Sequence, residues 1–293
     1  MGQGKGAMET VHELEPNAAA GPQQPNARVQ SCGYLLELSL DWIVLRASEN
    51  IHHLLGESHV TLIDEPLGRF VHSQALHDLR NLFSRLSGTI GIGRAYAVRL
   101  TNDPDLFDIA FQLSGGRVLL EAVPSTGAYG EAFGTVGGLI AGLSNSRGQA
   151  LLEGGARRMR ALTGYDRVTL IFGTRRAESS RGAFAVPADM EADLPTMVAD
   201  TKAEAVSVFP RDDDETSVSE ALLCAAPSDA LGALMTGTVR SMMRVPFDLD
   251  GLHGEFRCES RVPREPSFEL HAAAELFAQL FAMRLEIDQL KSG

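Results

Sequence analysis

The 293-residue sequence is poor in cysteine and in basic charge, and it contains no long apolar run. Its three cysteines, Cys32, Cys224 and Cys258, are too few and too scattered to predict a disulfide framework or a zinc site. Lys and Arg number 26 against 38 Asp and Glu, so the net charge is −12 and the basic surface typical of nucleic-acid binding is missing. No apolar run approaches the roughly 18 residues that span a bilayer, and no signal peptide opens the chain. We therefore expect a cytoplasmic protein that binds neither nucleic acid nor membrane.

Catalytic motifs are also missing. The glycine pairs lack the strand–loop–helix context of a nucleotide site, and no Ser/His/Asp or Cys/His arrangement has local support. The acidic run at 212–214 is more typical of a solvated loop than of a metal site. The sequence thus predicts no catalytic centre and no metal, so this chain is not expected to be an enzyme by itself.

The length and a hydrophobic content of 44% favour two domains with their own cores. Residues 1–28 are rich in Gly, Ala, Gln, Asn and Pro and predict a flexible arm. Residues 29–125 form a first domain, and the Gly-rich residues 126–148 a linker with a helix over 134–143. Residues 149–290 form a second domain that includes a long C-terminal helix.

In the first domain, the apolar pattern predicts strands over 34–40, 42–47, 95–100, 106–113 and 117–123. Helices are predicted over 49–55 and 73–86, the first capped by Ser48 and ended by Gly56. The pair Gly115-Gly116 is typical of a hairpin turn between the last two strands.

In the second domain, a helix from 149 is ended by Gly164 and followed by a strand over 168–172. We further predict a charged hairpin tip at 175–178, a return strand over 182–186 and a short helix over 194–202. A helix over 228–235 capped by Ser228 precedes strands over 240–249 and 252–259, joined at Asp250-Gly251. The final helix, 267–290, is apolar on more than one face. One face is expected to pack on the sheet of its own domain, and the other could pair with a second copy of the chain. Alternatively, all of these apolar residues belong to the core of the domain.

Residues 162–168 read Leu-Thr-Gly-Tyr-Asp-Arg-Val, a string that closely resembles the start of the GAF domain in phytochrome photoreceptors. The order of elements in 29–125 resembles the PAS domain that precedes it in bacterial phytochromes. The resemblance implies an α+β fold in which a PAS domain is followed by a GAF domain. Each would have a central antiparallel sheet flanked by helices, with the long helix at the C-terminus.

The resemblance also implies where a bilin pigment would bind, and the matching residues depart from the pattern. Residues 29–33, Val-Gln-Ser-Cys-Gly, replace Ile-Gln-Pro-His-Gly, which leaves Cys32 near the usual attachment point or simply as an inert thiol. Asp193 in 190–195 matches the aspartate of Pro-Ala-Ser-Asp-Ile-Pro, although a helix N-cap explains it equally well. Cys258 keeps the cysteine of Cys-His-His, but Glu259 and Ser260 replace both imidazoles. Arg240, with Arg244 and Arg257, is a candidate partner for the propionates of a bilin.

By this resemblance the chain is a sensory input module of a phytochrome-like signalling protein that has lost the usual bilin site. We expect no cofactor, with biliverdin or another bilin as the alternative. The expected partners are a second copy through the C-terminal helix and an output kinase or regulator domain, so that the chain would be the input part of a histidine kinase. Two alternatives stay open: a true red/far-red photoreceptor with an atypical pocket, and a ligand-free PAS–GAF interaction module. A redox role for Cys32 or Cys258 would need an accessible thiolate.

Overall fold

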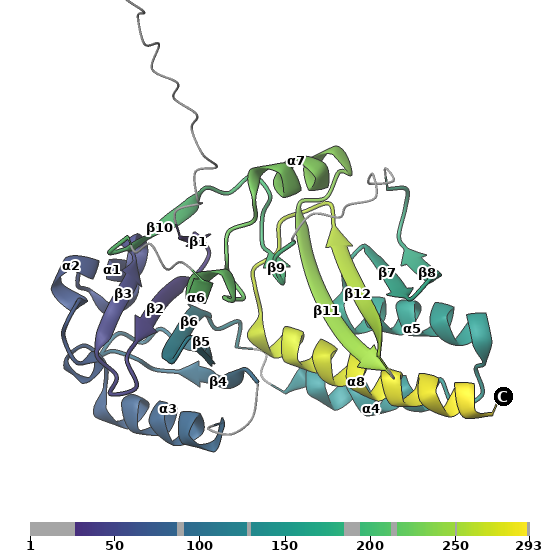
Figure 1. Ribbon diagram of the computed structural model, residues 1–293, viewed down its shortest axis with the longest axis horizontal. Coiled ribbons are helices and arrows are strands. Elements are labelled where there is room, and N and C mark those ends of the chain that lie inside the picture. The colour runs from purple at the N-terminus through teal and green to yellow at the C-terminus, as the bar shows by residue number, and fades with distance from the viewer. Residues whose placement is uncertain are drawn as a thin grey trace, which may run out of the picture.

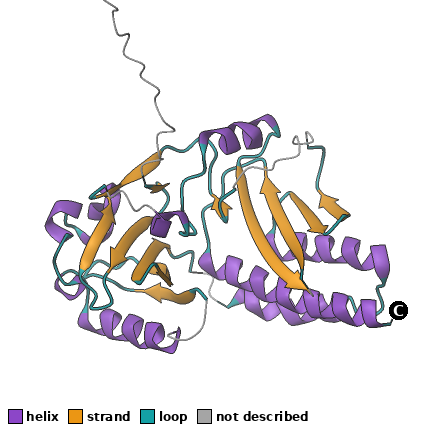
Figure 2. Ribbon diagram, in the orientation of Figure 1, coloured by secondary structure: helices purple, strands orange, loops and turns teal. Residues whose placement is uncertain are grey.

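The computed structural model describes residues 27–86, 91–127, 130–184, 194–211, 216–249 and 251–291. Nearly all of the predicted N-terminal arm, the candidate Asp193 and the acidic run 212–214 lie outside the described residues. The described part forms two lobes that lie side by side, each with an antiparallel sheet and helices packed against it (Figure 1). Figure 2 shows the same separation of strands and helices within each lobe. The predicted α+β fold class is therefore confirmed.

The first lobe is built on a seven-stranded sheet in the order β1-β10-β3-β2-β6-β5-β4. Five of these strands lie where the sequence predicts them, within a few residues. The glycines between β5 and β6, Gly115 and Gly116, have φ of +55° and +78°, which suits the predicted hairpin turn. The strands are β1 (Arg28–Gln30), β2 (Tyr34–Leu38), β3 (Val44–Ser48), β4 (Gly93–Val98), β5 (Phe107–Ser114), β6 (Arg117–Pro124) and β10 (Ala205–Phe209).

The strand β10 comes from the C-terminal half of the chain but pairs with the first sheet, between β1 and β3. Val206 lies opposite Val29, and Val208 lies opposite Ser48. The apolar residues Val29, Leu35 and Val208 share a small core on this edge of the sheet. A segment of the predicted second domain thus completes the sheet of the first.

Short helices and one longer helix cover the first sheet. Helix α3 (Ser73–Leu86) has the predicted bounds, and Gly56 ends α1 (His52–Leu55) in a left-handed conformation, with φ of +73°. Ser48 occupies the predicted N-cap position, but its hydroxyl caps no helix amide and instead accepts a hydrogen bond from the amide of Leu35 on the neighbouring strand, at 3.1 Å. The remaining short elements are η1 (Glu49–Ile51), α2 (His59–Leu62) and η2 (Leu67–Arg69).

The second lobe has a five-stranded sheet in the order β8-β7-β12-β11-β9. Helices α5 (Gly148–Thr163) and α8 (Phe268–Leu290) pack on one face of this sheet, and α4 (Glu131–Ala141) runs alongside α8 (Figure 1). Phenyl rings from the sheet and from α8 pack together in the core, among them Phe256 and Phe281, which meet edge-to-face with 5.3 Å between centroids. The strands are β7 (Arg167–Phe172), β8 (Arg175–Ser180), β9 (Met197–Val198), β11 (Ser241–Leu249) and β12 (Leu252–Ser260).

Three local predictions in this lobe are wrong. Residues 175–178 are part of β8 rather than a hairpin tip, because the chain already turns at Gly173, whose φ is +57°. Strand β8 is itself the return strand, so the predicted strand over 182–186 is absent at 182–184, while residues 185 and 186 lie outside the described residues. The helix predicted over 194–202 is replaced by β9, because Val198 pairs with Met242 at the edge of the sheet and packs into a core with Leu194.

Helices α6 (Thr216–Ser219) and α7 (Ser228–Thr236) follow β10. Helix α7 confirms the prediction over 228–235, but Pro227 occupies its N-cap position and no side chain caps it. The hairpin between β11 and β12 also forms as predicted, and Gly251 has φ of +75°.

The C-terminal helix α8 has two distinct sides. Ser267 caps it by accepting a hydrogen bond from the amide of Leu270 at 3.2 Å. Its buried side joins the main core of the second lobe, whereas several large apolar residues on the other side are exposed, namely Leu276, Met283, Ile287 and Leu290. Within the part of the chain that the structure describes, no helix is long and apolar enough to cross a membrane.

Buried polar contacts join the two lobes. The carboxylate of Glu121 on β6 accepts hydrogen bonds from the amides of Leu222 and Leu223, at 3.0 and 2.7 Å. Arg94 on β4 reaches α8, where it pairs with Glu275 at 2.8 Å and with His271 at 2.9 Å. Because these contacts are buried or half-buried, the lobes are packed against each other rather than simply tethered.

Candidate ligand-binding face

The second sheet has two faces of opposite chemistry. Since side chains alternate along a strand, one set points toward α5 and α8 and the other set points away. The helix side is apolar and includes Leu170, Val245 and Phe256. The other side carries arginine and glutamate in the central strands, and we call it the charged face. Its central residues are Arg167, Thr169, Ile171, Met242, Arg244, Pro246, Glu255, Arg257 and Glu259.

The strand register arranges these residues in three rows across β7, β12 and β11. Arg167 lies opposite Glu259, which lies opposite Met242. In the next row, Thr169 lies opposite Arg257, which lies opposite Arg244. The last row is Ile171, Glu255 and Pro246. Arginines and glutamates are therefore neighbours across strands and along β12, which favours ion pairs over the whole face.

Arg167 and Glu259 form a buried ion pair. Arg167 Nε donates to Glu259 Oε2 at 2.6 Å, and the two side chains are only 4% and 2% exposed. The guanidinium of Arg167 also lies 4.4 Å from the ring of Phe184. Because a buried charge is costly without a partner, each member of this pair is needed to neutralise the other.

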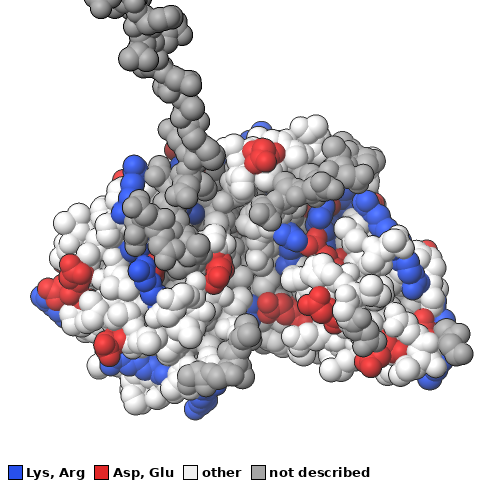
Figure 3. All heavy atoms as spheres, in the orientation of Figure 1, with Lys and Arg blue, Asp and Glu red and all other residues white. Residues whose placement is uncertain are grey.

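The second ion-pair group shares one glutamate between two arginines. Arg244 Nε donates to Glu255 Oε2 at 2.7 Å, and Arg257 Nε donates to Glu255 Oε1 at 3.2 Å. Glu255 is 7% exposed, while Arg244 and Arg257 are 29% and 19% exposed. Arg244 also donates through Nη1 to the carbonyl of Leu194, which ties the start of the β9 segment to the sheet. In Figure 3, basic and acidic side chains lie side by side where Figure 1 draws β11 and β12.

Arg240, a predicted site residue, lies just before β11 and forms an ion pair with Asp200. Its Nε and Nη2 both donate to the carboxylate of Asp200, at 2.9 and 2.8 Å. Desolvation acts to raise the pKa of Asp200, but hydrogen bonds from the amide of Lys202 and from Arg240 outweigh it and hold this pKa below its ordinary value. Both partners of the pair are therefore charged near neutral pH.

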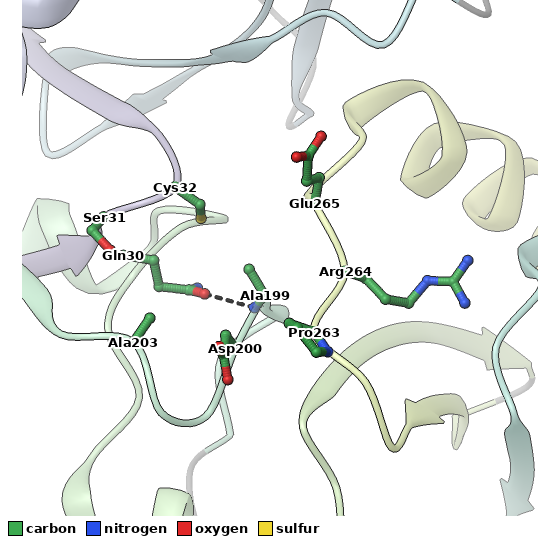
Figure 4. Close-up of a pocket in the computed structure, with 9 residues that line it drawn as sticks. All are labelled: Gln30, Ser31, Cys32, Ala199, Asp200, Ala203, Pro263, Arg264 and Glu265. Carbon is green, nitrogen blue, oxygen red and sulfur yellow. Dashed lines mark hydrogen bonds between the residues drawn. The ribbon is translucent and has the colours of Figure 1, made fainter.

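Cys32 lines an open pocket of ≈ 340 Å³ at the junction of the lobes (Figure 4). The pocket is formed by the turn after β1, the loop after β9 and the segment before α8. Asp200 also lines it, so the structure brings Cys32 close to the partner of Arg240. Figure 4 shows the side chain of Gln30 bonded to the amide of Ala199 across one wall, at 2.8 Å.

The thiols do not have the properties of reactive groups. Burial raises the pKa of Cys32 to about 11 and that of Cys258 to about 12, so both are protonated near neutral pH. Cys258 is fully buried on the helix side of the sheet, away from the charged face. Cys32 and Cys258 therefore do not share a site, and neither supports the redox role considered from the sequence.

Histidines do not supply the missing imidazoles on the charged face. None of its described central residues is a histidine. His253 lies at the exposed end of the β11–β12 hairpin, paired with Asp248 at 3.1 Å, and His271 is buried on α8. Among the described residues there is also no group of His, Cys, Asp and Glu that could hold a metal ion.

Sequence reasoning named Arg240 as a candidate but did not recognise Arg167, Glu255 and Glu259 as members of an ion-paired set. The available signal was the alternation of Arg and Glu in β12, where Glu255, Arg257 and Glu259 share one side of the strand. The pairing of Arg167 with Glu259 required the register between β7 and β12. That register could not be read from either strand alone.

A family model described as PAS fold matches residues 20–124. A comparison with curated protein sequences found no match. Solved structures, in contrast, match over almost the whole chain.

The chromophore-binding domain of an unusual bacteriophytochrome from R. palustris aligns with a TM-score of 0.74 and 20% identity, over 90% of this chain and 96% of that one. A variant of the chromophore-binding domain of a Stigmatella aurantiaca bacteriophytochrome in the Pr state aligns with a TM-score of 0.73 and 24% identity, over 89% and 96%. A longer bacteriophytochrome chain from R. palustris gives a TM-score of 0.76 at 20% identity, and this chain spans 61% of it. The chain therefore contains a PAS fold over residues 20–124 and has, as a whole, the fold of bacteriophytochrome chromophore-binding domains.

Proposed function

We propose that this chain is a sensory input module of the phytochrome type that does not bind biliverdin in the usual way. In this proposal a PAS domain over 29–125, completed by the strand at 205–209, is joined through 126–148 to a GAF domain over 149–290. The module acts in the cytoplasm and has no catalytic activity of its own.

The main support is the chemistry of the charged face. By the resemblance described above, Glu259 and Ser260 replace the two histidines of the family's Cys-His-His string. Glu259 lies on the charged face, where its carboxylate forms an ion pair with Arg167 at 2.6 Å. A largely apolar tetrapyrrole would have to cover this pair and the Arg244–Glu255–Arg257 group, and none of the central residues of this face is a histidine. Covalent attachment has little support either, because the thiol of Cys32 is protonated near neutral pH.

A titration with biliverdin tests this proposal. The purified protein is mixed with biliverdin in the dark, and absorbance is recorded before and after red light. We expect neither a red absorbance band nor photoconversion. A saturable red band would contradict the proposal and favour the alternative of a photoreceptor with an atypical pocket. Haem serves as a second probe, since a Soret band would indicate that a different tetrapyrrole is the cofactor.

A second aspect of the proposal concerns the partner of α8. The exposed or half-exposed apolar residues on this helix follow the alternating spacing of four and three that is typical of a coiled-coil seam. In a parallel pair of such helices, Glu286 of one copy would lie near Lys291 of the other, which adds a favourable charge contact. The seam consists of Leu276, Leu280, Met283, Ile287 and Leu290. We propose that two copies pair along this seam and that α8 continues the signal toward an output kinase or regulator domain.

Sedimentation of the full chain tests the pairing. Met283→Glu and Ile287→Glu place charges in the seam without touching the core, and we expect both variants to shift the protein from dimer to monomer. Gln279→Glu, an exposed position beside the seam, is the matched control and should stay dimeric. A monomeric wild type at high concentration would contradict this part of the proposal, whereas a dimer without pigment binding would favour the interaction-module alternative.

A further inference from the structure

The ion-pair group at the centre of the charged face carries one positive charge more than its carboxylate balances. Arg167 and Glu259 neutralise each other, and so do Arg240 and Asp200. The remaining group contains two arginines, Arg244 and Arg257, and a single carboxylate, Glu255. The surplus charge is therefore localised at the centre of the sheet face, at the junction of β11 and β12.

The two arginines are held together against their mutual repulsion. Arg244 and Arg257 lie directly opposite each other in the register of β11 and β12, where like charges destabilise a sheet. Glu255 bonds both, one through each carboxylate oxygen, and so fixes the two guanidinium groups side by side. The sheet thus presents a rigid pair of guanidinium groups rather than two independent surface arginines.

Donor groups on this pair are available. The only hydrogen bond that Arg257 makes with the described residues is from Nε to Glu255, so its Nη1 and Nη2 have no partner among them. Arg257 and Arg244 are 19% and 29% exposed, whereas Glu255 is only 7% exposed. Arg244 uses Nε and Nη2 for Glu255 and Nη1 for the carbonyl of Leu194, so it offers only the second hydrogens of Nη1 and Nη2. A planar guanidinium with two parallel N–H groups matches a carboxylate or phosphate in a bidentate geometry.

We propose that Arg244 and Arg257 form a binding site for a small oxyanion, either a phosphate or a carboxylate, on the charged face. The anion neutralises the surplus charge and accepts hydrogen bonds from Nη1 and Nη2 of Arg257 and from the remaining Nη hydrogens of Arg244. The site deepens the proposed sensory role by naming a ligand class for the same sheet face, and its meaning as a signal rests on that role. The arginines need only a compact anion with two acceptor oxygens, so the site does not require a tetrapyrrole.

Thermal unfolding of the full chain at low ionic strength tests the site. The probes are inorganic phosphate and acetate, which distinguish the two ligand sources, and sodium chloride at equal ionic strength corrects for screening. For the wild type we expect a saturable rise in Tm with at least one probe, beyond the effect of chloride. A Tm that follows ionic strength alone for all three salts would overturn the proposal.

Two variants and one control locate the response. Arg257→Gln and Arg244→Gln each leave one arginine paired with Glu255, so the local charge is balanced and the fold is retained. In both we expect the apparent affinity for the anion to fall by about tenfold or more, because charged hydrogen bonds are lost. Arg176→Gln removes an exposed arginine on β8 that pairs loosely with Glu178, at 3.9 Å, and should respond like the wild type. An unchanged response in Arg257→Gln would also overturn the site.

The result of the anion-binding test can be distinguished from the result of the biliverdin test of the proposed function. A biliverdin-binding protein with no anion response would contradict both proposals, whereas no biliverdin binding and no anion response would overturn only the anion site. An anion response that biliverdin does not compete with supports the site as stated. Isothermal titration calorimetry on the wild type and Arg257→Gln provides a second measurement for any variant whose unfolding is irreversible.

Discussion

His271 on α8 accepts a hydrogen bond through Nδ1 from Nη2 of Arg94 on β4, at 2.9 Å, and so joins the C-terminal helix to the sheet of the first lobe. The ring is buried, and its Nε2 has no partner among the described residues. Desolvation and, second, the nearby Arg94 lower the pKa of His271 to about 3, so the imidazole is neutral in the folded protein. Two of the predictions below follow from the chemistry of the junction between the lobes.

The first prediction is that His271 makes the protein sensitive to acid. Its folded pKa of about 3 lies below the ordinary value of 6.5, so the unfolded chain binds a proton first as the pH falls. Between these two values the contribution of His271 to stability decreases as the pH decreases, by at most about 1.4 kcal/mol per pH unit. The variant His271→Gln keeps an acceptor for Arg94 and does not titrate. The difference in unfolding free energy between wild type and variant should fall from pH 6.5 toward pH 3, and a pH-independent difference would contradict the prediction.

The second prediction concerns Glu121, whose effect has the opposite sign. Desolvation raises its pKa to about 7, despite hydrogen bonds from the amides of Leu223 and Leu222. The folded protein therefore binds a proton more tightly than the unfolded chain between the ordinary value of 4.5 and pH 7, and stability is lost as the pH rises through this window. Relative to Glu121→Gln, the wild type should lose at most about 1.4 kcal/mol per pH unit over that range. Urea unfolding of both proteins at a series of pH values measures it, and parallel curves would be the contrary result.

The third prediction is that the pair Arg167–Glu259 is costly to break but simple to replace. Arg167→Met leaves the carboxylate of Glu259 buried without its partner, so we expect a loss of about 3–5 kcal/mol in unfolding free energy. The double variant Arg167→Met/Glu259→Leu removes both charges and should be about as stable as the wild type, or more stable. Chemical denaturation of the wild type and the two variants measures these differences in unfolding free energy. Equal losses in the single and double variants would show that the pair acts through packing and not through charge.

The fourth prediction concerns the close packing of α5 on α8. A methyl group at Gly155 would overlap the ring of Phe281, so Gly155→Ala should destabilise the protein by about 1–3 kcal/mol. Gly232 in α7 is the matched control, because a methyl group there meets no heavy atom within 4 Å. Gly232→Ala should be stabilising by about 0.5–1 kcal/mol, since alanine favours the helix. If both variants changed stability equally, helix propensity rather than the contact with Phe281 would determine the effect of an alanine at residue 155.

Much of the fold was predictable because local signals and tertiary packing agree. Helix α3, the turn at Gly115-Gly116 and the end of α5 at Gly164 all depend on periodicity and glycine conformation within a short window. The errors fall where a distant partner decides the local structure. The segment 194–202 follows an extended path because β11 and the core around Leu194 stabilise it, and β10 forms because the edges of β1 and β3 are available.

The candidate site was less predictable for the same reason. Arg240 was named a candidate for its proximity to the pocket positions that the resemblance implies, but the charge balance around it depends on Asp200, which lies 40 residues earlier in the chain. The ion pairs of the charged face depend on register between strands that are far apart in sequence, such as β7 and β12. Cys258 is conspicuous in the sequence, yet the alternation of β12 directs it into the core.

The return of the chain to the first sheet at β10 limits how this protein can be divided. A fragment ending at residue 125 would leave β1 without the strand it pairs with and would uncover the hydrogen-bonding edge of β3. Such a fragment is expected to aggregate or unfold, even though it contains a complete sequence match to a PAS fold. The boundary that sequence comparison draws is thus not a boundary of cooperative folding, and the two lobes should melt in a single transition.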